Sequence, residues 1–388
     1  MRILFVADGR SPTAVSWMRY FVDSGHDVHL ASTFRSQPEL KLASQHFVPV
    51  AFSERAGNGE GGPSSARRMV PLQWRTRLRQ WAGPLTLEKA ARELRKITAE
   101  VQPEIVHALR IPFEGMLAAE AAPSAALLIS IWGNDFTLHA PSSPMMRSAT
   151  RKSLCRTDGL LSDTVRDYKL SWEWGFDPVK PSLVVPGNGG IRSEIFHLTK
   201  DKPKSPPTVI NPRGLRAYVR NDLFFKAIPL VVEQIPEARF ICPAMKGEAE
   251  AEKWVRELGI GAHVELLPKL SAKEMAEAYQ RSTVMVSPSE HDGTPNSLLE
   301  AMACGVYPVA GDLDSVREWI VDGENGTLVD LQDDGKLAEG IIAALKDEET
   351  RQQATQRNQQ IIAERAAHEN VMPKVEELYR TIIKNKKG

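Results

Sequence analysis

Short apolar runs alternate with amphipathic stretches along most of the chain. Residues 3–7 are a continuous apolar run, as a buried parallel strand requires. Apolar side chains then recur at helical spacing from Val15 to Val22, and Gly25 ends that pattern before a second apolar run at 28–31. The order strand, helix, strand predicts the start of a doubly wound α/β domain.

The same alternation continues in two blocks. Strands are also expected at 104–109, 125–133, 208–212, 238–244, 263–268, 282–289, 306–311 and 326–330, and helices at 223–235 and 249–258. Residues 186–207 are rich in Pro, Gly and Lys, which is typical of a linker. We therefore expect one Rossmann-like domain over 1–185 and a second over 208–365, and a C-terminal helix over 366–388 that crosses back to the first domain.

The length and charge balance favour two ordinary globular domains. The chain has 388 residues, with 49 Lys+Arg and 49 Asp+Glu, and this balance argues against a general nucleic-acid binder. Cys155, Cys242 and Cys304 are too scattered for a disulfide framework or a zinc site, so a reducing compartment is expected. The first apolar run is too short for a signal peptide. These features indicate a cytoplasmic protein with no nucleic-acid partner.

The segment 289–305 places two acids, Asp292 and Glu300, around the start of an apolar helical run. We expect Asn296 or Ser297 to cap this helix, whose free backbone N–H groups would form an anion site suited to phosphate. Each carboxylate can accept hydrogen bonds from a vicinal diol. The pair could span a ligand with a diphosphate in its middle, sugar hydroxyls at one end and a ribose at the other.

Cations that would offset these carboxylates are expected in the loop 212–222, directly after the first strand of the second domain. The loop carries Arg213, Arg216 and Arg220. Arginine is preferred for fork-like phosphate contacts. The alternative interpretation makes the first acid an ordinary turn residue and the second a solvated helix residue, because polar loops before helices are common.

Several ordered motifs resemble those of the family-4 retaining glycosyltransferases, whose fold is called GT-B. The run D-G-T-P-N-S-L-L-E-A-M-A-C-G at 292–305 resembles the family's E-x7-E signature. V-V-P-G-N-G-G-I at 184–191 resembles the start of its linker, and D-G-E-N-G-T-L-V at 322–329 a later glycine-rich turn. The resemblance implies two Rossmann-like doubly wound domains facing a central cleft, with the acceptor side in 1–185 and the donor side in 208–365.

Carried over residue by residue, the resemblance implies a nucleotide-sugar site in the second domain. Asp292 would contact the donor-sugar hydroxyls, Glu300 would hold the ribose, and Arg213 would bind the diphosphate. The residues of the loop and helix start that would meet the donor are Gly293, Thr294, Pro295, Asn296 and Ser297.

Two departures concern the donor site. Asp292 replaces the usual Glu, so it reaches the sugar with one methylene less. The Lys that accompanies the diphosphate-binding Arg in the family is absent. Arg220 is the first choice as its substitute, and Arg216 is the rival.

A third departure concerns the acceptor side. Trp132 stands where many members have a His that faces the acceptor. Asp135 or His139 could serve instead. His107, at the end of a predicted strand, is open to two interpretations, an acceptor ligand or a core histidine.

The implied reaction is transfer of a sugar from a UDP- or GDP-sugar to a hydroxyl of a glycan or lipid-linked acceptor, with retention of configuration. Arg213, Arg220 and the helix start would stabilise the leaving diphosphate. The resemblance suggests assembly of cell-envelope polysaccharide or glycoconjugate. The nucleotide sugar is a substrate, so no cofactor is expected, and no metal. Asp312 and Asp314 form a D-x-D sequence, which we interpret as a turn with Asp caps.

Two alternatives remain: a non-catalytic nucleotide-sugar-binding or regulatory subunit, and a sugar-nucleotide epimerase of the same architecture. A dinucleotide oxidoreductase is disfavoured because A-D-G-R-S-P-T-A-V after the first strand lacks G-x-G-x-x-G.

Residues 66–85 are basic and amphipathic. The stretch has five arginines and no acid, and its apolar side chains follow helical spacing: Trp74, Leu78, Trp81 and Leu85. Such a helix could lie on an anionic membrane at the inner face of the plasma membrane, or pack its tryptophans on the first domain.

Overall fold

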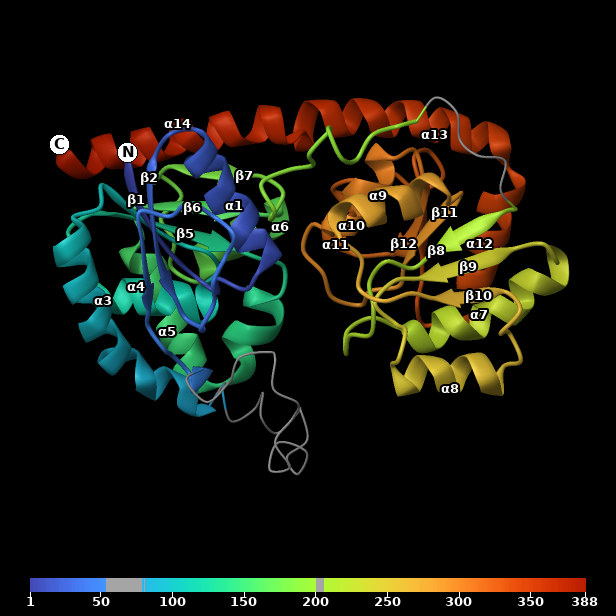
Figure 1. Cartoon of the computed structure of the whole chain (residues 1–388), viewed down its shortest axis with the longest axis horizontal. Coiled ribbons are helices and arrows are strands. Elements are labelled where there is room, and N and C mark those ends of the chain that lie inside the picture. Colours follow the sequence, from blue (N-terminus) through green and yellow to red (C-terminus); the bar gives the residue numbers. More distant parts are fainter. Residues whose placement is uncertain (54–78, 80, 200–205) are drawn as a thin grey trace. The chain divides into compact units, whose positions relative to one another are not determined.

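The computed structural model describes residues 1–53, 79, 81–199 and 206–388 (Figure 1). The chain divides into two compact units, one of Met1–Gly189 with Met372–Gly388, the other of Gly190–Val371. Most of the basic stretch 66–85 and part of the expected linker, residues 200–205, lie outside the described residues.

The first unit is built on a seven-stranded parallel sheet. Its order is β3(Ser44–Phe47)-β2(Asp27–Ser32)-β1(Arg2–Ala7)-β4(Ile105–Ala108)-β5(Ala126–Ile131)-β6(Gly159–Ser162)-β7(Ser182–Val184). Strands β1 and β5 are mostly apolar because both faces of the sheet are covered. Phe5 on β1 pairs with His107 on β4.

Helices cover this sheet. They are α1(Pro12–Asp23), α3(Leu87–Val101), α4(Met116–Ala121), α5(Pro144–Arg156), α6(Val165–Glu173) and α14(His368–Lys387). Helix α3 turns Leu94 and Ile97 into a core that includes Val106 and Ile129 of the sheet. Helix α14 joins this unit from Met372 onward, where Tyr379 stacks on Phe21 of α1 at 4.8 Å between ring centroids.

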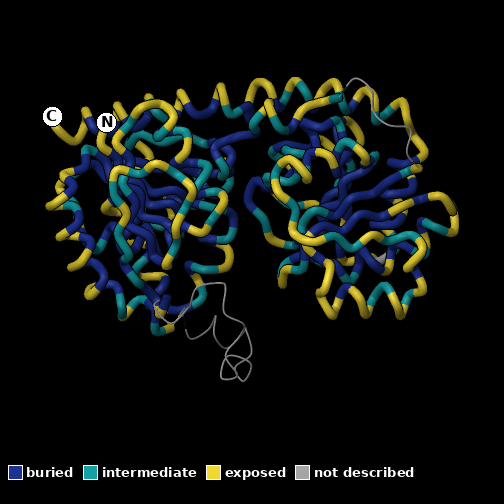
Figure 2. Tube along the Cα trace, viewed as in Figure 1, coloured by how far each residue is buried: buried dark blue, intermediate teal, exposed yellow. Residues whose placement is uncertain are grey.

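The second unit has a six-stranded parallel sheet. Its order is β10(Val264–Leu266)-β9(Arg239–Cys242)-β8(Thr208–Ile210)-β11(Val284–Ser287)-β12(Tyr307–Gly311)-β13(Thr327–Val329). Its helices are α7(Asn221–Gln234), α8(Ala249–Glu257), α9(Ala272–Gln280), α10(Asn296–Ala303), α11(Asp314–Arg317), α12(Asp334–Lys346) and α13(Glu348–Ile361). Figure 2 shows buried strands in each unit and helices whose outer sides are exposed. The prediction of two doubly wound α/β domains is confirmed.

The strand order fixes where ligands can bind in each unit. The order reverses between β1 and β4 in the first sheet and between β8 and β11 in the second. In open parallel sheets, ligands bind outside the carboxyl ends of the strands at such a reversal. The loops that leave β1, β4, β8 and β11 are therefore the places to look for function. None of the described helices is both long enough and apolar enough to span a bilayer.

Candidate functional site

An ion pair joins the two loops at the strand reversal of the second unit. Arg213 follows β8, and Asp292 follows β11. Arg213 Nη2 lies 2.5 Å from Asp292 Oδ2, and both side chains are nearly buried, at 12% and 14% exposure. Arg213 Nη1 lies 3.5 Å from Ser297 Oγ. Within the described residues, Arg213 Nε has no hydrogen-bond partner. The guanidinium therefore keeps a donor that a ligand could use.

Burial raises the pKa of Asp292, and the Arg213 guanidinium partly offsets that rise. The Ser315 hydroxyl donates to the Asp292 carbonyl oxygen at 2.8 Å, which fixes the loop behind the carboxylate. Asp292 is thus a nearly buried carboxylate that is fixed in position by its ion pair with Arg213 and by the Ser315 hydrogen bond to its backbone. The alternative interpretation of Asp292, an ordinary turn residue, stays a prediction.

Helix α10 begins within this site, and the prediction of its cap is wrong. Neither Asn296 nor Ser297 is the N-cap; that position is Pro295, which has no side-chain hydrogen bond to offer. The helix start therefore lacks a side-chain cap, and Asn296 Oδ1 is buried without a partner in the described part of the chain. A helix start of this kind leaves backbone N–H groups for an anion.

The loop that leads into α10 is packed against α11 and the segment behind it. Gly293, Thr294 and Pro295 are buried. The Trp319 indole N–H donates to Thr294 Oγ1 at 3.0 Å. The loop is thus supported from behind, which keeps the helix start in place.

Glu300 lies one turn into α10 and is not a solvated residue. Tyr279 of α9 donates its hydroxyl hydrogen toward Glu300 Oε2 at 3.3 Å and toward the Ser297 carbonyl at 3.2 Å. Part of the Glu300 surface is accessible, but protein atoms surround the carboxyl, and this burial raises its pKa to about 7. The Tyr279 hydroxyl and the positive charges of Arg192 and Arg213 limit the rise. A buried carboxylate that costs free energy to ionise indicates a functional role.

The structure changes the ranking of the two other arginines. Arg220 Nε and Nη2 both bind the Asp222 carboxylate at 2.9 Å, and Nη1 lies 3.3 Å from Glu290. Its charge is already neutralised, so the choice of Arg220 as the second phosphate cation is not supported. Arg216 is the better candidate for this role. It is exposed, its charge lowers the pKa of Asp292, and its Nε donates to the Arg213 carbonyl oxygen at 3.1 Å.

The D-x-D sequence also differs from its prediction. Asp312 forms a two-bond ion pair with Arg317, at 2.5 and 2.6 Å, and the N-cap of α11 is Leu313 rather than an Asp. Across the described residues, no group of three His, Cys, Asp or Glu side chains is placed to hold a metal ion.

In the first unit, Asp135 lies after β5 and is only 1% exposed. Its Oδ2 accepts the backbone N–H groups of Ile111 and Trp132 at 3.1 and 3.2 Å, and its Oδ1 accepts Arg110 Nη2 at 3.0 Å. A carboxylate this enclosed cannot meet a substrate directly, so the catalytic role expected for Asp135 is corrected to one of positioning. It holds Arg110 and the turn after β4.

His107 is a core histidine, so its candidacy as an acceptor ligand is corrected. It is fully buried between Phe5 and Trp17. One ring nitrogen bonds to the Tyr379 hydroxyl and the other to Ser130 Oγ. Burial lowers the pKa of His107 to about 3, so the ring is neutral.

His139, by contrast, lines a pocket. The pocket has a volume of about 340 Å³ and is formed by Asp8, Arg10, Phe34, Arg79, Arg110, Pro112, Phe113, Glu114, His139 and Met146. Burial and the charge of Arg110 lower the pKa of His139 to about 4. Trp132 is partly exposed and contributes its backbone N–H to Asp135. The structure does not show Trp132 in this pocket lining.

Sequence reasoning missed three residues that the structure brings to these sites. Tyr279 reaches Glu300 from the neighbouring helix, and Arg110 and Glu114 line the pocket of the first unit. A signal for Arg110 was available, because it follows a strand end as Arg213 does. No comparable signal marked Tyr279 or Glu114.

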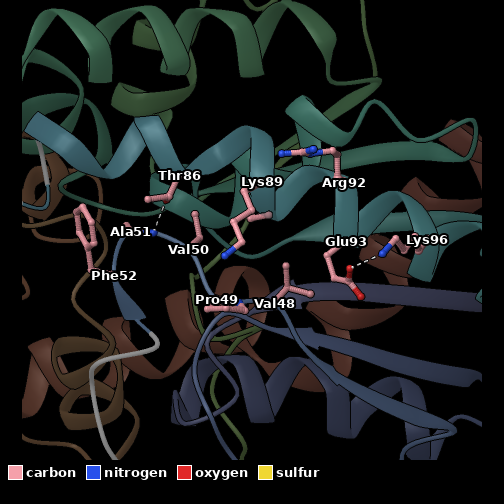
Figure 3. Close-up of a pocket in the computed structure, with 11 residues that line it drawn as sticks. Val48, Pro49, Val50, Ala51, Phe52, Thr86, Lys89, Arg92, Glu93 and Lys96 are labelled. Atoms are coloured by element: carbon pink, nitrogen blue, oxygen red, sulfur yellow. Dashed lines mark hydrogen bonds and ion pairs between the residues drawn. The ribbon is translucent and has the colours of Figure 1, made fainter.

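A larger hollow of about 570 Å³ lies beside helix α3 (Figure 3). Val48, Val50 and Ala51 form part of its apolar wall, and Lys89 and Lys96 of α3 line it from the other side. Two residues of the basic stretch that are described, Trp81 and Leu85, are 58% and 71% exposed. The prediction that the apolar face of this stretch packs on the first domain is therefore wrong for these two residues. Trp74 and Leu78 lie outside the described residues.

Comparison with known sequences identifies both halves of the chain. A family model described as glycosyl transferases group 1 matches residues 193–361, and one described as glycosyl transferase 4-like matches residues 2–164. A D-inositol 3-phosphate glycosyltransferase of Thermomonospora curvata is 27% identical over 50% of this chain and 50% of its own. A phosphatidyl-myo-inositol mannosyltransferase of Mycolicibacterium smegmatis is 27% identical over 85% of this chain and 79% of its own. The chain thus matches about half the length of the first relative.

Solved structures share the fold over nearly the whole chain. Sucrose-phosphate synthase from Thermosynechococcus elongatus superposes with a TM-score of 0.75 at 16% identity, over 99% of this chain and 100% of that one. HepE of Anabaena, in complex with UDP, gives 0.74 at 14% identity, over 98% and 100%. With both halves matched by glycosyltransferase family models, the chain belongs to the group 1, family-4 glycosyltransferases and has the GT-B fold.

Proposed function

We propose that this protein transfers a sugar from a UDP- or GDP-sugar to a hydroxyl of a glycan or lipid-linked acceptor, with retention of configuration and without a metal. The observation that carries the proposal is the pairing of Arg213 with Asp292 at the uncapped start of α10, with Glu300 one turn further on. These groups can meet, in order, the hydroxyls of a sugar, a diphosphate and a ribose diol.

Each side chain has a role set by its chemistry. Asp292 accepts hydrogen bonds from the donor-sugar hydroxyls, and Glu300 accepts those of the ribose. Arg213 binds the diphosphate through its open Nε N–H together with the backbone N–H groups at the start of α10. Arg216 adds positive charge to the same loop. Arg220 holds the loop by its bonds to Glu290 and acts as a positioning residue.

The chemistry follows from where charge develops. As the bond from the anomeric carbon to the diphosphate breaks, the leaving oxygen becomes negative, and Arg213 and the helix start stabilise it. The acceptor hydroxyl forms the new bond to the anomeric carbon from the same face, and its proton passes to a phosphate oxygen. This route needs no nucleophile from the protein.

Related proteins support parts of this proposal. HepE was solved with UDP and with UDP-glucose, which supports a nucleoside diphosphate sugar as the donor. A relative that mannosylates phosphatidyl-myo-inositol supports a lipid-linked acceptor. Assembly of cell-envelope polysaccharide or glycoconjugate, at the cytoplasmic side of the membrane, is the setting we propose.

The test is product analysis. Wild type, Arg213→Ala and the control Arg256→Ala, an exposed arginine of α8, are incubated with UDP- and GDP-sugars and a panel of glycan and lipid-linked acceptors. NMR of the product gives its anomeric configuration. We expect retention, and a loss of about 100-fold or more in turnover for Arg213→Ala with an unchanged unfolding midpoint. Full turnover in Arg213→Ala would contradict the site. Conversion of the donor sugar without transfer would indicate an epimerase, and binding without turnover a regulatory subunit.

We also propose that the first unit contacts an anionic membrane surface. Exposed Trp81 and Leu85 lie just before α3, whose Lys89, Arg92 and Lys96 add positive charge beside the hollow of Figure 3. Flotation with anionic liposomes tests this. We expect binding at low salt that Trp81→Ala with Leu85→Ala weakens; no binding of wild type would contradict the proposal.

A further inference from the structure

The pocket of about 340 Å³ in the first unit lies at the strand reversal of its sheet. Arg10 follows β1, Phe34 follows β2, and Arg110 and Glu114 follow β4. The pocket thus has the same place in its sheet as the donor residues have in theirs. It is lined by three arginines, Arg10, Arg79 and Arg110, and the donor chemistry does not use them.

Two of the three arginines have carboxylate partners. Arg10 makes two bonds to Asp8, at 3.0 and 2.9 Å, and Arg110 binds Asp135 at 3.0 Å. Arg79 forms no ion pair with any described residue, and its Nε is buried without a hydrogen-bond partner. Arg79 is therefore the cation of this pocket whose charge is least compensated.

Aromatic rings hold these cations in place. The Arg10 guanidinium lies 3.7 Å from the ring centroid of Phe34, and that of Arg79 lies 4.9 Å from Phe113 and 5.4 Å from Phe34. Contact with a ring face leaves the N–H edges of a guanidinium available for hydrogen bonds. The rings thus position the arginines before any ligand binds.

Glu114 supplies the opposite chemistry. It is 3% exposed, and its Oε1 accepts the Thr33 hydroxyl at 2.7 Å. Its Oε2 is buried and has no partner among the described residues. Burial raises the pKa of Glu114. An open Oε2 and an open Arg79 Nε in one pocket call for a ligand that both donates and accepts hydrogen bonds, as a hydroxyl-bearing anion does.

The backbone at Arg110 is strained. Its φ is +92°, a conformation that side-chain-bearing residues rarely adopt. Asp135 holds it by accepting both the Arg110 guanidinium and the N–H of Ile111. A strained conformation that is pinned by a fully buried carboxylate indicates that the direction of Arg110 matters for function.

We propose that this pocket binds the acceptor of the transfer reaction, and that the acceptor is a polyol carrying a phosphate or carboxylate group. The anionic group lies against Arg79 and Arg110, and a neighbouring hydroxyl donates to Glu114 Oε2. That the ligand is the acceptor of a transfer reaction rests on the proposed function. The binding of such a ligand to this pocket can be tested independently of that function.

Calorimetric titration with small probes tests it. The probes are inorganic phosphate, sn-glycerol 3-phosphate, glycerate and glycerol. The proteins are wild type, Arg79→Gln, Glu114→Gln and Arg147→Gln, the last an exposed arginine of α5 next to the pocket residue Met146. The unfolding midpoint of each variant is recorded, because Glu114 is buried. Binding of UDP and of GDP is measured on the same samples.

We expect wild type to bind sn-glycerol 3-phosphate or glycerate but not glycerol. Arg79→Gln should weaken both phosphate probes about tenfold or more, and Arg147→Gln should not. Glu114→Gln should remove the preference for sn-glycerol 3-phosphate over inorganic phosphate without weakening inorganic phosphate itself. That pattern separates the hydroxyl contact from the anion contact and is not produced by loss of folding.

The anion could be free or part of a lipid headgroup. Vesicles of phosphatidylglycerol, compared with phosphatidylcholine, provide the second source. Binding to them that both Arg79→Gln and Glu114→Gln weaken would support a lipid-borne acceptor, since buried Glu114 cannot contact a bilayer surface. Failure of both the soluble anions and the vesicles to bind wild type, or equal binding by Arg79→Gln, would overturn the proposal. Failure to bind both UDP and GDP, with the anion probes still bound, would count against the proposed function instead.

Discussion

Glu300 offers the sharpest test of the donor site, because its function and its contribution to stability are opposed. Its folded-state pKa of about 7 lies above the ordinary value of 4.5. Between those two values the folded protein keeps a proton that the unfolded chain releases. The free energy of unfolding therefore falls as pH rises through this window, and the full cost is present above pH 7. Glu300→Gln has no charge to bury and can still accept the Tyr279 hydrogen bond.

The size of the effect follows from the shift. About 2.5 pKa units at about 1.36 kcal/mol each give about 3 kcal/mol as an upper value, and partial exposure of the side chain reduces it to about 2 kcal/mol. For a unit of this size, each kcal/mol moves the unfolding temperature by about 2–4 °C. We expect Glu300→Gln to unfold about 4–8 °C above wild type at pH 8 and at nearly the same temperature at pH 4.5.

Scanning calorimetry of both proteins from pH 4.5 to 8.5 measures this difference. Hydrogen exchange of peptides from α9 and α10 assigns the transition to the second unit. Glu277→Gln, an exposed acid of α9, is the matched control and should show no such trend. The same Glu300→Gln protein should bind a nucleoside diphosphate more weakly at pH 8. A stability difference that does not change with pH would refute the reasoning, because it would mean that Glu300 ionises normally.

Three further expectations follow from the contacts of single residues. Tyr279→Phe removes the hydroxyl that lowers the pKa of Glu300, so the pH above which a nucleoside diphosphate binds tightly should move upward in calorimetric titrations; an unchanged pH profile would remove Tyr279 from the site. Arg216→Gln should reduce donor turnover more than Arg220→Gln, whose guanidinium is already paired, and the reverse order in steady-state kinetics would contradict this assignment. His107 has a folded-state pKa of about 3 against an ordinary 6.5, so wild type should lose up to about 1.4 kcal/mol of stability per pH unit below 6.5. In urea denaturation the stability gap between wild type and His107→Gln should therefore narrow from pH 7 to pH 5; a constant gap would mean that the histidine charges freely.

Most strands of the two sheets could be predicted from apolar runs. All six strands of the second sheet lie inside the ranges expected for strands, and β8, β11 and β12 are buried at every residue, as central parallel strands are. In the first sheet, β6(Gly159–Ser162), β7(Ser182–Val184) and the edge strand β3(Ser44–Phe47) were missed. The β3 sequence S-Q-H-F is polar and only partly buried, so no apolar run marks it. Pairing with β2 holds it in the sheet, and pairing leaves no trace in a single sequence.

Two residues of the proposed donor site could be predicted because they follow strand ends. Arg213 and Asp292 both leave strands at the reversal of the sheet, and their ion pair is a consequence of that topology. Choosing between Arg216 and Arg220 could not be done from sequence. The choice depends on Asp222, which neutralises Arg220 through two bonds that only the turn geometry determines.

The most direct measurement is calorimetric titration of the full chain with UDP, GDP and ADP, with and without EDTA, on wild type and Glu300→Ala. Exposed Glu277→Ala is the control. We expect one nucleotide to bind wild type and the control with an affinity that EDTA does not change, and to bind Glu300→Ala far more weakly. Absence of binding for all three nucleotides, or equal binding by Glu300→Ala, would contradict the assignment of the donor site to Arg213, Asp292 and Glu300.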